Sequence, residues 1–123
     1  MARKLLVVDD EEMIRSSLKE LFELEEYDVV IAENGTHAWE LIENNSFCFV
    51  LSDAKMPNGS GIELLEKIQT ITNGRPQVVL MTGDANIDRE EGINKGALDL
   101  IYKPIDFQNL LQIIQDSSSP ESQ

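Results

Sequence analysis

Four stretches of the sequence carry acidic, hydroxyl or basic side chains directly after a short apolar run. They are Asp9-Asp10, Ser52-Asp53, Thr82-Gly83-Asp84 and Lys103-Pro104. Clustered carboxylates repel one another unless a cation lies among them, and oxygen ligands favour Mg²⁺, with Mn²⁺ as a substitute. A hard metal ion beside a lysine ammonium and a threonine hydroxyl suits the oxygens of a phosphoryl group. If the stretches meet, they predict a site for phosphoryl chemistry.

Asp53 is the candidate nucleophile of such a site. A carboxylate beside a divalent ion can attack phosphorus and form an acyl phosphate. A central strand would place Asp53 between the other acids and Lys103. The metal would screen Asp53 from its acidic neighbours and withdraw charge from the incoming phosphoryl group.

Each stretch also has an ordinary structural interpretation. Acids at positions 10–12 favour the first turn of a helix, and a single acid after a strand, such as Asp53, is common in turns. Thr82-Gly83 fits a strand-to-loop turn, and Lys103 fits an exposed lysine before a helix-starting proline. Taken one at a time, these interpretations are the simpler ones. If all four stretches fall at one edge of a sheet, however, that coincidence favours a functional site.

Five short apolar runs alternate with segments of helical periodicity. The runs cover residues 5–8, 29–31, 47–51, 78–81 and 98–102, and they are too short for buried helices. The alternation predicts an α/β fold of five βα units, with a doubly wound parallel sheet covered by helices on both faces. Such sheets bind ligands at the carboxyl ends of their strands, where the four polar stretches fall.

Two segments depart from this pattern. Residues 87–95 form a poor helix, because their apolar face is thin and Gly92 costs about 1 kcal/mol relative to Ala. Residues 116–123 are polar and aperiodic, so we expect a domain over residues 1–115 followed by a tail or the start of a linker. Cys48 falls within the third run and is expected in the core.

Composition disfavours several classes of protein. The chain has 123 residues, which fits one domain, and its net charge of −13 repels nucleic acid and anionic lipid. One cysteine and one histidine exclude an internal disulfide, a cysteine-cluster zinc site and a multi-histidine metal site. No apolar run approaches the roughly 20 residues of a membrane span, and no signal peptide is evident, so we expect a cytoplasmic protein.

The four stretches together resemble the response-regulator receiver domain of two-component signalling. The resemblance covers about residues 4–115 and lies in Val7-Val8-Asp9-Asp10-Glu11, Leu51-Ser52-Asp53-Ala54-Lys55-Met56-Pro57, Met81-Thr82-Gly83 and Lys103-Pro104. It implies a flavodoxin-like fold with strand order 2-1-3-4-5. It also implies that Asp53 accepts a phosphoryl group from the phosphohistidine of a sensor histidine kinase or a phosphotransfer protein.

The resemblance further implies a metal site. Asp9, Asp10 and Asp53 would hold Mg²⁺ together with the backbone carbonyl of Lys55. Because that carbonyl is the ligand, the side chain of Lys55 is free for another task. We hypothesise that Lys55 and Asp84 control water access and set the dephosphorylation rate.

The remaining matches concern the phosphoryl group and the switch. The hydroxyl of Thr82, next to Gly83, would move toward the phosphoryl group, and Lys103 would pair with it from a cis bond to Pro104. Phosphorylation adds about −1.5 to −2 charges, so the loop before the weak fourth helix would move with Thr82. The surface of helix four, strand five and helix five would then change, to control a partner or an output domain.

One position departs from the family pattern. Leu100 stands three residues before Lys103, where the family often has Tyr or Phe, and Tyr102 stands directly before Lys103. We therefore expect the loop backbone, rather than an aromatic side chain, to transmit the switch.

Other functions remain open at this stage. A degenerate receiver would act only as a protein-interaction module. Against it stand the intact residues Asp10, Asp53, Thr82 and Lys103. A flavodoxin-like redox protein needs a glycine-rich phosphate loop, whereas the acidic run at 9–12 would repel a flavin phosphate. The favoured interpretation is a self-phosphorylating switch with no turnover substrate, and therefore not an enzyme. An unknown downstream protein and a phosphorylation-dependent dimer are compatible with it, and neither nucleic acid nor a membrane is expected to bind directly.

Overall fold

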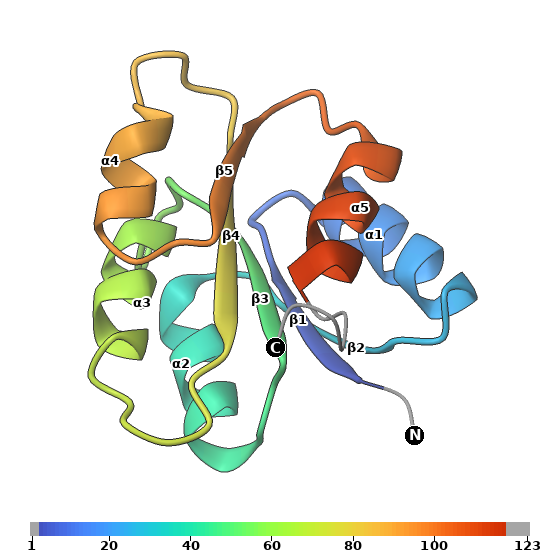
Figure 1. Cartoon of the computed structure of the whole chain (residues 1–123), viewed down its shortest axis with the longest axis horizontal. Coiled ribbons are helices and arrows are strands. Elements are labelled where there is room, and N and C mark those ends of the chain that lie inside the picture. The colour runs from blue at the N-terminus through green and yellow to red at the C-terminus, as the bar shows by residue number, and fades with distance from the viewer. Residues whose placement is uncertain (1–2, 118–123) are drawn as a thin grey trace.

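The computed structural model describes residues 3–117, and within them five strands alternate with five helices (Figure 1). The strands are β1 (Lys4–Val8), β2 (Asp28–Ala32), β3 (Phe49–Asp53), β4 (Gln77–Thr82) and β5 (Asp99–Tyr102). The helices are α1 (Glu12–Leu24), α2 (Gly35–Asn44), α3 (Gly61–Ile68), α4 (Arg89–Asn94) and α5 (Phe107–Ser117). This alternation confirms the predicted α/β fold.

The strands form one parallel sheet of order β2-β1-β3-β4-β5. This order confirms the flavodoxin-like topology. The register places the carboxyl ends of the strands at one edge, with Val8 beside Ser52 and Thr82 beside Tyr102. Residues that follow these strands therefore lie next to one another.

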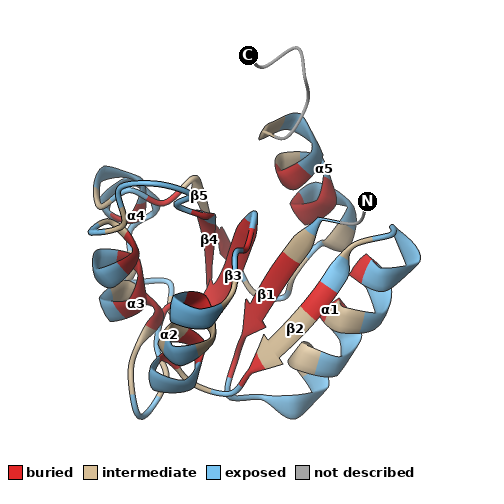
Figure 2. Cartoon of the chain, turned by 90° about the horizontal axis from the view of Figure 1, so that it is seen from below, coloured by how far each residue is buried: buried red, intermediate tan, exposed pale blue. Residues whose placement is uncertain are grey.

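Helices cover both faces of the sheet. Figure 1 shows α1 and α5 on one face and α2, α3 and α4 on the other. Successive strand residues point to opposite faces, so Leu5 and Val7 lie in the core beneath α1 and α5, whereas Leu6 and Val8 lie in the core beneath the other helices. Figure 2 shows how completely the central strands are buried. Burial on both faces explains why the strands have continuous apolar sequences.

Side-chain caps define where four helices begin, and at α5 the Asp106 carboxylate accepts a 3.3 Å hydrogen bond from the Asn109 N–H. The Asn34 side chain accepts a 2.8 Å hydrogen bond from the His37 N–H at the start of α2. Ser60 and Glu63 form a capping box at the start of α3, and Asp88 caps α4. Such caps satisfy backbone donors that the helix itself leaves free. The caps of α3 and α4 fix the ends of the loops that follow Asp53 and Thr82, whereas α1, which follows Asp9 and Asp10, has no side-chain cap.

Several boundaries differ from the sequence predictions. Strand β3 begins at Phe49, where pairing with Leu5 begins, so Cys48 precedes the strand and is exposed rather than part of the core. Helix α4 is shorter than the predicted 87–95 segment. Helix α5 continues to Ser117, so the first two residues of the predicted tail are helical. The rest of that tail, residues 118–123, lies outside the described residues.

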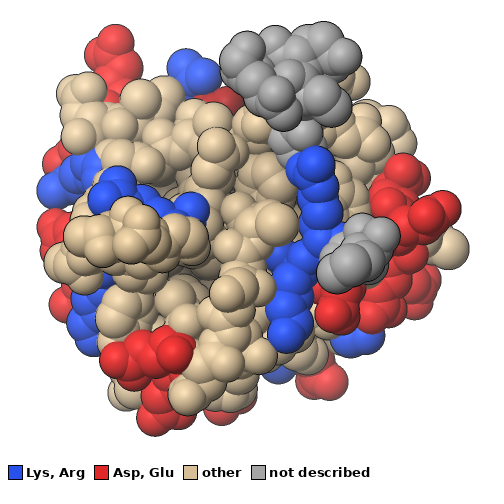
Figure 3. Space-filling model, turned by 60° about the horizontal axis from the view of Figure 1, so that its bottom comes forward, with Lys and Arg blue, Asp and Glu red and all other residues tan. Residues whose placement is uncertain are grey.

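Charge is unevenly distributed over the surface. On the face shown in Figure 3, acidic side chains gather on the side that carries α1. The end of α1 and the turn after it contribute the exposed acids Glu20, Glu23, Glu25 and Glu26. Among residues 3–117, no helix has the length and apolarity needed to cross a bilayer.

Candidate functional site

The polar stretches meet at the carboxyl edge of the sheet. Asp9 directly follows β1, and Asp53 is the last residue of β3. One carboxylate oxygen from each of Asp9, Asp10 and Asp53 lies within 4.8 Å of the others. Asp9 is fully buried, Asp53 is 7% exposed and Asp10 is exposed. Three acids therefore surround one point that solvent reaches from the side of Asp10.

Lys103 connects two of these acids. Its Nζ lies 3.0 Å from Asp9 Oδ2 and 3.1 Å from Asp53 Oδ2, and its side chain is 15% exposed. The ammonium also donates a 3.2 Å hydrogen bond to Glu11 Oε1. Sequence reasoning missed this contact, because it assigned Glu11 only to the start of a helix. The ammonium thus neutralises part of the acidic cluster.

Burial and pairing shift the pKa values of two site residues. Burial raises the pKa of Asp9, although hydrogen bonds from the Glu11 N–H and the Lys103 ammonium oppose this effect. Burial alone would lower the pKa of Lys103, but hydrogen bonds to Asp9 and Asp53 outweigh it and raise that pKa well above its usual value. Lys103 is therefore a permanent positive charge at the site.

Thr82 ends β4 beside the acids and is buried. Its Oγ1 accepts a 3.0 Å hydrogen bond from the Asp84 N–H, and its carbonyl oxygen accepts a 2.7 Å bond from the Lys103 N–H. The Lys103-Pro104 peptide bond is cis. A Cβ atom at Gly83 would meet nothing within 4 Å, so space alone does not require glycine there.

Lys55 and Asp84 form an ion pair at the rim of the site. Lys55 Nζ lies 2.7 Å from Asp84 Oδ2, and the pair joins the β3–α3 loop to the β4–α4 loop. The Lys55 ammonium and the Asn86 N–H hold the pKa of Asp84 below its ordinary value. The Lys55 N–H also donates a 3.2 Å hydrogen bond to Asp53 Oδ1, so the loop backbone orients the candidate nucleophile.

The structure also shows contacts near β5 that sequence reasoning missed. The Tyr102 hydroxyl donates a hydrogen bond of 2.6 Å to the Ile87 carbonyl oxygen, and Arg89 pairs with Asp99 at 2.6 Å. Leu100 is 1% exposed and packs in the core on the α4 side. The sequence feature that could have indicated the Tyr102 contact is its position two residues after Leu100, which places both side chains on the same face of the strand.

Comparison with known families decides the assignment. The family model described as the response regulator receiver domain matches residues 5–115. The chain belongs to this family. Receiver domains are signalling domains that bind Mg²⁺ at an acidic pocket, and no turnover activity is indicated for them.

Curated relatives of this receiver domain are longer than the chain. The CpxR homolog of Haemophilus influenzae, a transcriptional regulatory protein, is 37% identical over 97% of this chain and 53% of its own length. CpxR of Escherichia coli K12 is 34% identical over 91% of this chain and 47% of its own length. The chain thus spans about half the length of these relatives. Because these relatives are transcriptional regulators and only their receiver domains are covered by this chain, the expectation of no nucleic-acid binding is not supported.

Solved structures show the same fold. A CheY-like receiver domain from Methanospirillum hungatei superimposes with a TM-score of 0.85 at 34% identity, covering 95% of this chain and 94% of its own. A receiver domain from Clostridium thermocellum gives a TM-score of 0.86 at 32% identity, covering 98% and 97%. These matches confirm the predicted fold over nearly the whole length.

The donor atoms of the receiver's acidic cluster fit Mg²⁺. Hard divalent cations prefer oxygen ligands, and Mg²⁺ is bound through one or a few carboxylates while it keeps several waters. Asp9, Asp10 and Asp53 supply carboxylate oxygens, and the exposure of Asp10 leaves room for water. Soft or nitrogen ligands are not part of this cluster, so its chemistry disfavours zinc or copper.

Proposed function

We propose that this receiver domain takes a phosphoryl group onto Asp53 from the phosphohistidine of a sensor histidine kinase or a phosphotransfer protein. The observation that carries the proposal is the position of Asp53 within the carboxylate cluster and 3.1 Å from the Lys103 ammonium. Positive charge fixed beside a nucleophile stabilises the phosphoryl oxygens during transfer. The resemblance to receiver domains also implies that Asp53 is the phosphoacceptor.

Asp9, Asp10 and Asp53 would hold Mg²⁺, or Mn²⁺ in its place, together with the backbone carbonyl of Lys55. When bound, the cation neutralises the carboxylates and withdraws charge from the phosphoryl oxygens. Asp9 is buried and its carboxylate oxygen accepts the Glu11 N–H at 2.9 Å, so it is held in place before any ion binds.

The side chains of this chain that take part in the transfer all lie at this edge of the sheet, while the donor supplies the phosphohistidine and the solvent supplies a proton. A carboxylate oxygen of Asp53 attacks the phosphorus, an O–P bond forms and the N–P bond of the phosphohistidine breaks. The electron pair stays with the imidazole nitrogen, which is protonated from solvent. Lys103 pairs with a phosphoryl oxygen, and the Thr82 hydroxyl, beside the open backbone of Gly83, exchanges the Asp84 N–H for a hydrogen bond to the phosphoryl group.

Lys55 and Asp84 would set how long the phosphoryl group survives. Their ion pair lies at the rim, on the two loops that flank Asp53 and Thr82. Water must pass this rim to hydrolyse the acyl phosphate. An open pair would admit water faster than a closed one.

The output would be read on the surface formed by α4, β5 and α5. Movement of Thr82 pulls the β4–α4 loop, and α4 is a short helix with Gly92 in its interior. A short helix with few stabilising contacts is suited to change position. A downstream protein, an attached output domain or a second phosphorylated copy would read the change, and the attached domain agrees with relatives about twice as long as this chain.

The alternative is a degenerate receiver that binds a partner without phosphorylation. The experiment is incubation with Mg²⁺ and a phosphoramidate, whose P–N bond stands in for phosphohistidine, followed by intact-mass measurement. The proposal expects one added phosphoryl group, lost in Asp53→Asn and in the presence of a chelator. Absence of any mass gain, or a gain that survives Asp53→Asn, would favour the degenerate receiver. The cytoplasmic location stays a prediction.

A further inference from the structure

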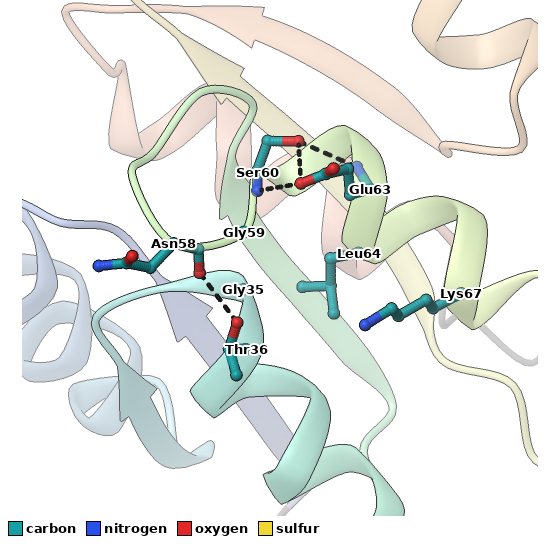
Figure 4. A pocket seen from close by; sticks show the side chains of 8 residues that line it. All are labelled: Gly35, Thr36, Asn58, Gly59, Ser60, Glu63, Leu64 and Lys67. Atoms are coloured by element: carbon teal, nitrogen blue, oxygen red, sulfur yellow. Dashed lines mark hydrogen bonds between the residues drawn. The ribbon is translucent and has the colours of Figure 1, made fainter.

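The first residues of α2 form hydrogen bonds to Asn58 and Gly59 of the β3–α3 loop. The Gly35 N–H donates a 2.9 Å hydrogen bond to the Gly59 carbonyl oxygen. The Thr36 Oγ1 donates a 3.0 Å bond to the Asn58 carbonyl oxygen, and the Thr36 backbone N–H lies 3.4 Å from the same oxygen. Figure 4 shows the Thr36 hydroxyl pointing up at this carbonyl from the first turn of α2. We refer to these contacts as the α2 clasp.

The clasp depends on close backbone approach. A Cβ atom on Gly35 would lie 2.6 Å from the Gly59 carbonyl oxygen, which no real side chain tolerates. Gly59 has a φ of +105°, and its own Cβ would lie 2.9 Å from the Thr36 nitrogen. Asn58 also has a positive φ, of 62°. The two segments therefore fit each other closely.

The loop that the clasp holds is the one that carries the phosphoacceptor. Its ends are fixed, because the Ala54 N–H bonds to the Met81 carbonyl at 2.7 Å and the Gly61 N–H bonds to the Ala54 carbonyl at 3.1 Å. Its beginning orients Asp53, through the 3.2 Å bond from the Lys55 N–H to Asp53 Oδ1. The clasp adds a third support, at Asn58 and Gly59, from helix α2, which follows strand β2.

We propose that Thr36 and Gly35 are positioning residues for the phosphoacceptor site. By fixing Asn58 and Gly59, they hold the loop that presents the Asp53 carboxylate and the Lys55 carbonyl to the metal ion. The inference rests on the proposed function, because it assigns these residues to a site that binds Mg²⁺. Neither residue touches the acidic cluster, so their effect is exerted only through the loop.

Thr36 allows a matched test, because its exposed side chain can be changed without disturbing a core. Thr36→Val removes the hydroxyl at nearly constant shape, and Thr36→Ser keeps the hydroxyl. Isothermal titration of the 123-residue chain with MgCl₂ measures the dissociation constant. Loss of one ordinary hydrogen bond predicts a dissociation constant about two- to fivefold larger for Thr36→Val, with Thr36→Ser equal to wild type.

Hydrogen exchange supplies a readout that needs no metal. We expect the Lys55 amide to exchange faster in Thr36→Val than in Thr36→Ser, while amides of β1 remain unchanged. A merely structural role would lower the melting temperature and leave both the magnesium affinity of the folded protein and the Lys55 amide unaffected. That pattern would overturn the inference. The proposed function would still stand if the wild-type protein binds magnesium. If wild type itself takes up no magnesium, both are overturned.

Discussion

The hydroxyl of Tyr102, at the end of β5, is bonded to the carbonyl oxygen of Ile87 in the β4–α4 loop at 2.6 Å. The bond crosses from the strand that precedes Lys103 to the loop that follows Thr82. Tyr102 lies on the same face of β5 as Leu100, which occupies the position where the family often has an aromatic residue. In this chain the aromatic ring is therefore placed two residues later, and its hydroxyl donates a hydrogen bond to the loop backbone.

Replacing Tyr102 with Phe removes this bond and keeps the ring. We expect the free energy of unfolding to fall by about 0.5–1 kcal/mol, because the bond lies at a half-exposed site. Amides of the β4–α4 loop should exchange faster, since the loop loses its tether to β5. Hydrogen exchange followed by NMR measures both, with β1 amides as the internal control. Unchanged protection of the loop would show that the bond restrains nothing.

Lys103→Met should affect stability and metal binding in opposite directions. Without the ammonium, the buried Asp9 loses its counter-charge, so the metal-free protein should lose about 1–3 kcal/mol of unfolding free energy. Mg²⁺ should bind this variant more tightly than wild type, because no ammonium competes for Asp9 and Asp53. Urea denaturation and calorimetry test the two halves.

The matched control is Lys19→Met, which breaks an exposed pair with Glu23 on α1. Lys19→Met should change neither the free energy of unfolding nor the free energy of magnesium binding by more than a few tenths of a kcal/mol. A Lys103→Met variant that binds Mg²⁺ more weakly than wild type would contradict the competition.

Mg²⁺ should stabilise the fold, because it relieves repulsion among three acids. At ten times its dissociation constant, the ion should raise the free energy of unfolding by about 1.4 kcal/mol. Asp10→Asn removes the exposed ligand and should lose most of this gain at the same ion concentration. Asp28→Asn, at the opposite end of the sheet, serves as the control and should keep it. Equal gains in both variants would place the ion elsewhere.

The Lys55–Asp84 pair makes a prediction about pH. The pKa of Asp84 lies below its ordinary value of 3.8, so the pair contributes stability above that pH and loses it as the pH falls through the lowered value. In Lys55→Ala the pKa of Asp84 should rise toward 3.8, as followed by carboxyl NMR titration. The phosphoryl half-life should shorten in Lys55→Ala and Asp84→Ala. An unchanged half-life in both variants would remove these residues from rate control.

The strands and their polar ends were predictable from sequence, because burial on both faces makes each strand a continuous apolar run. Asp9, Asp53 and Lys103 follow such runs, so parallel topology alone brings them to one edge. The limits of β3 were less predictable, because pairing with Leu5 rather than apolar content decides where the strand begins. For that reason Cys48, which looked like a core residue, is exposed.

Contacts between distant loops left no periodic signal. The approach of Gly35 to Gly59 joins segments of the chain that belong to different βα units, and neither glycine is distinctive alone. The Tyr102–Ile87 bond ends on a backbone carbonyl, which any residue would supply. Glu11 reaches Lys103 across a long sequence separation, while its local sequence predicts only a helix start. Such contacts follow from the assembled fold.

Borohydride reduction tests the phosphoacceptor most directly, since it converts an aspartyl phosphate to homoserine. The chain would be incubated with Mg²⁺ and phosphoramidate, reduced, cleaved and mapped by mass spectrometry. We predict homoserine at position 53 only when metal and donor are both present. Homoserine at another acidic position, or none at all after successful labelling of a control receiver domain, would contradict the account.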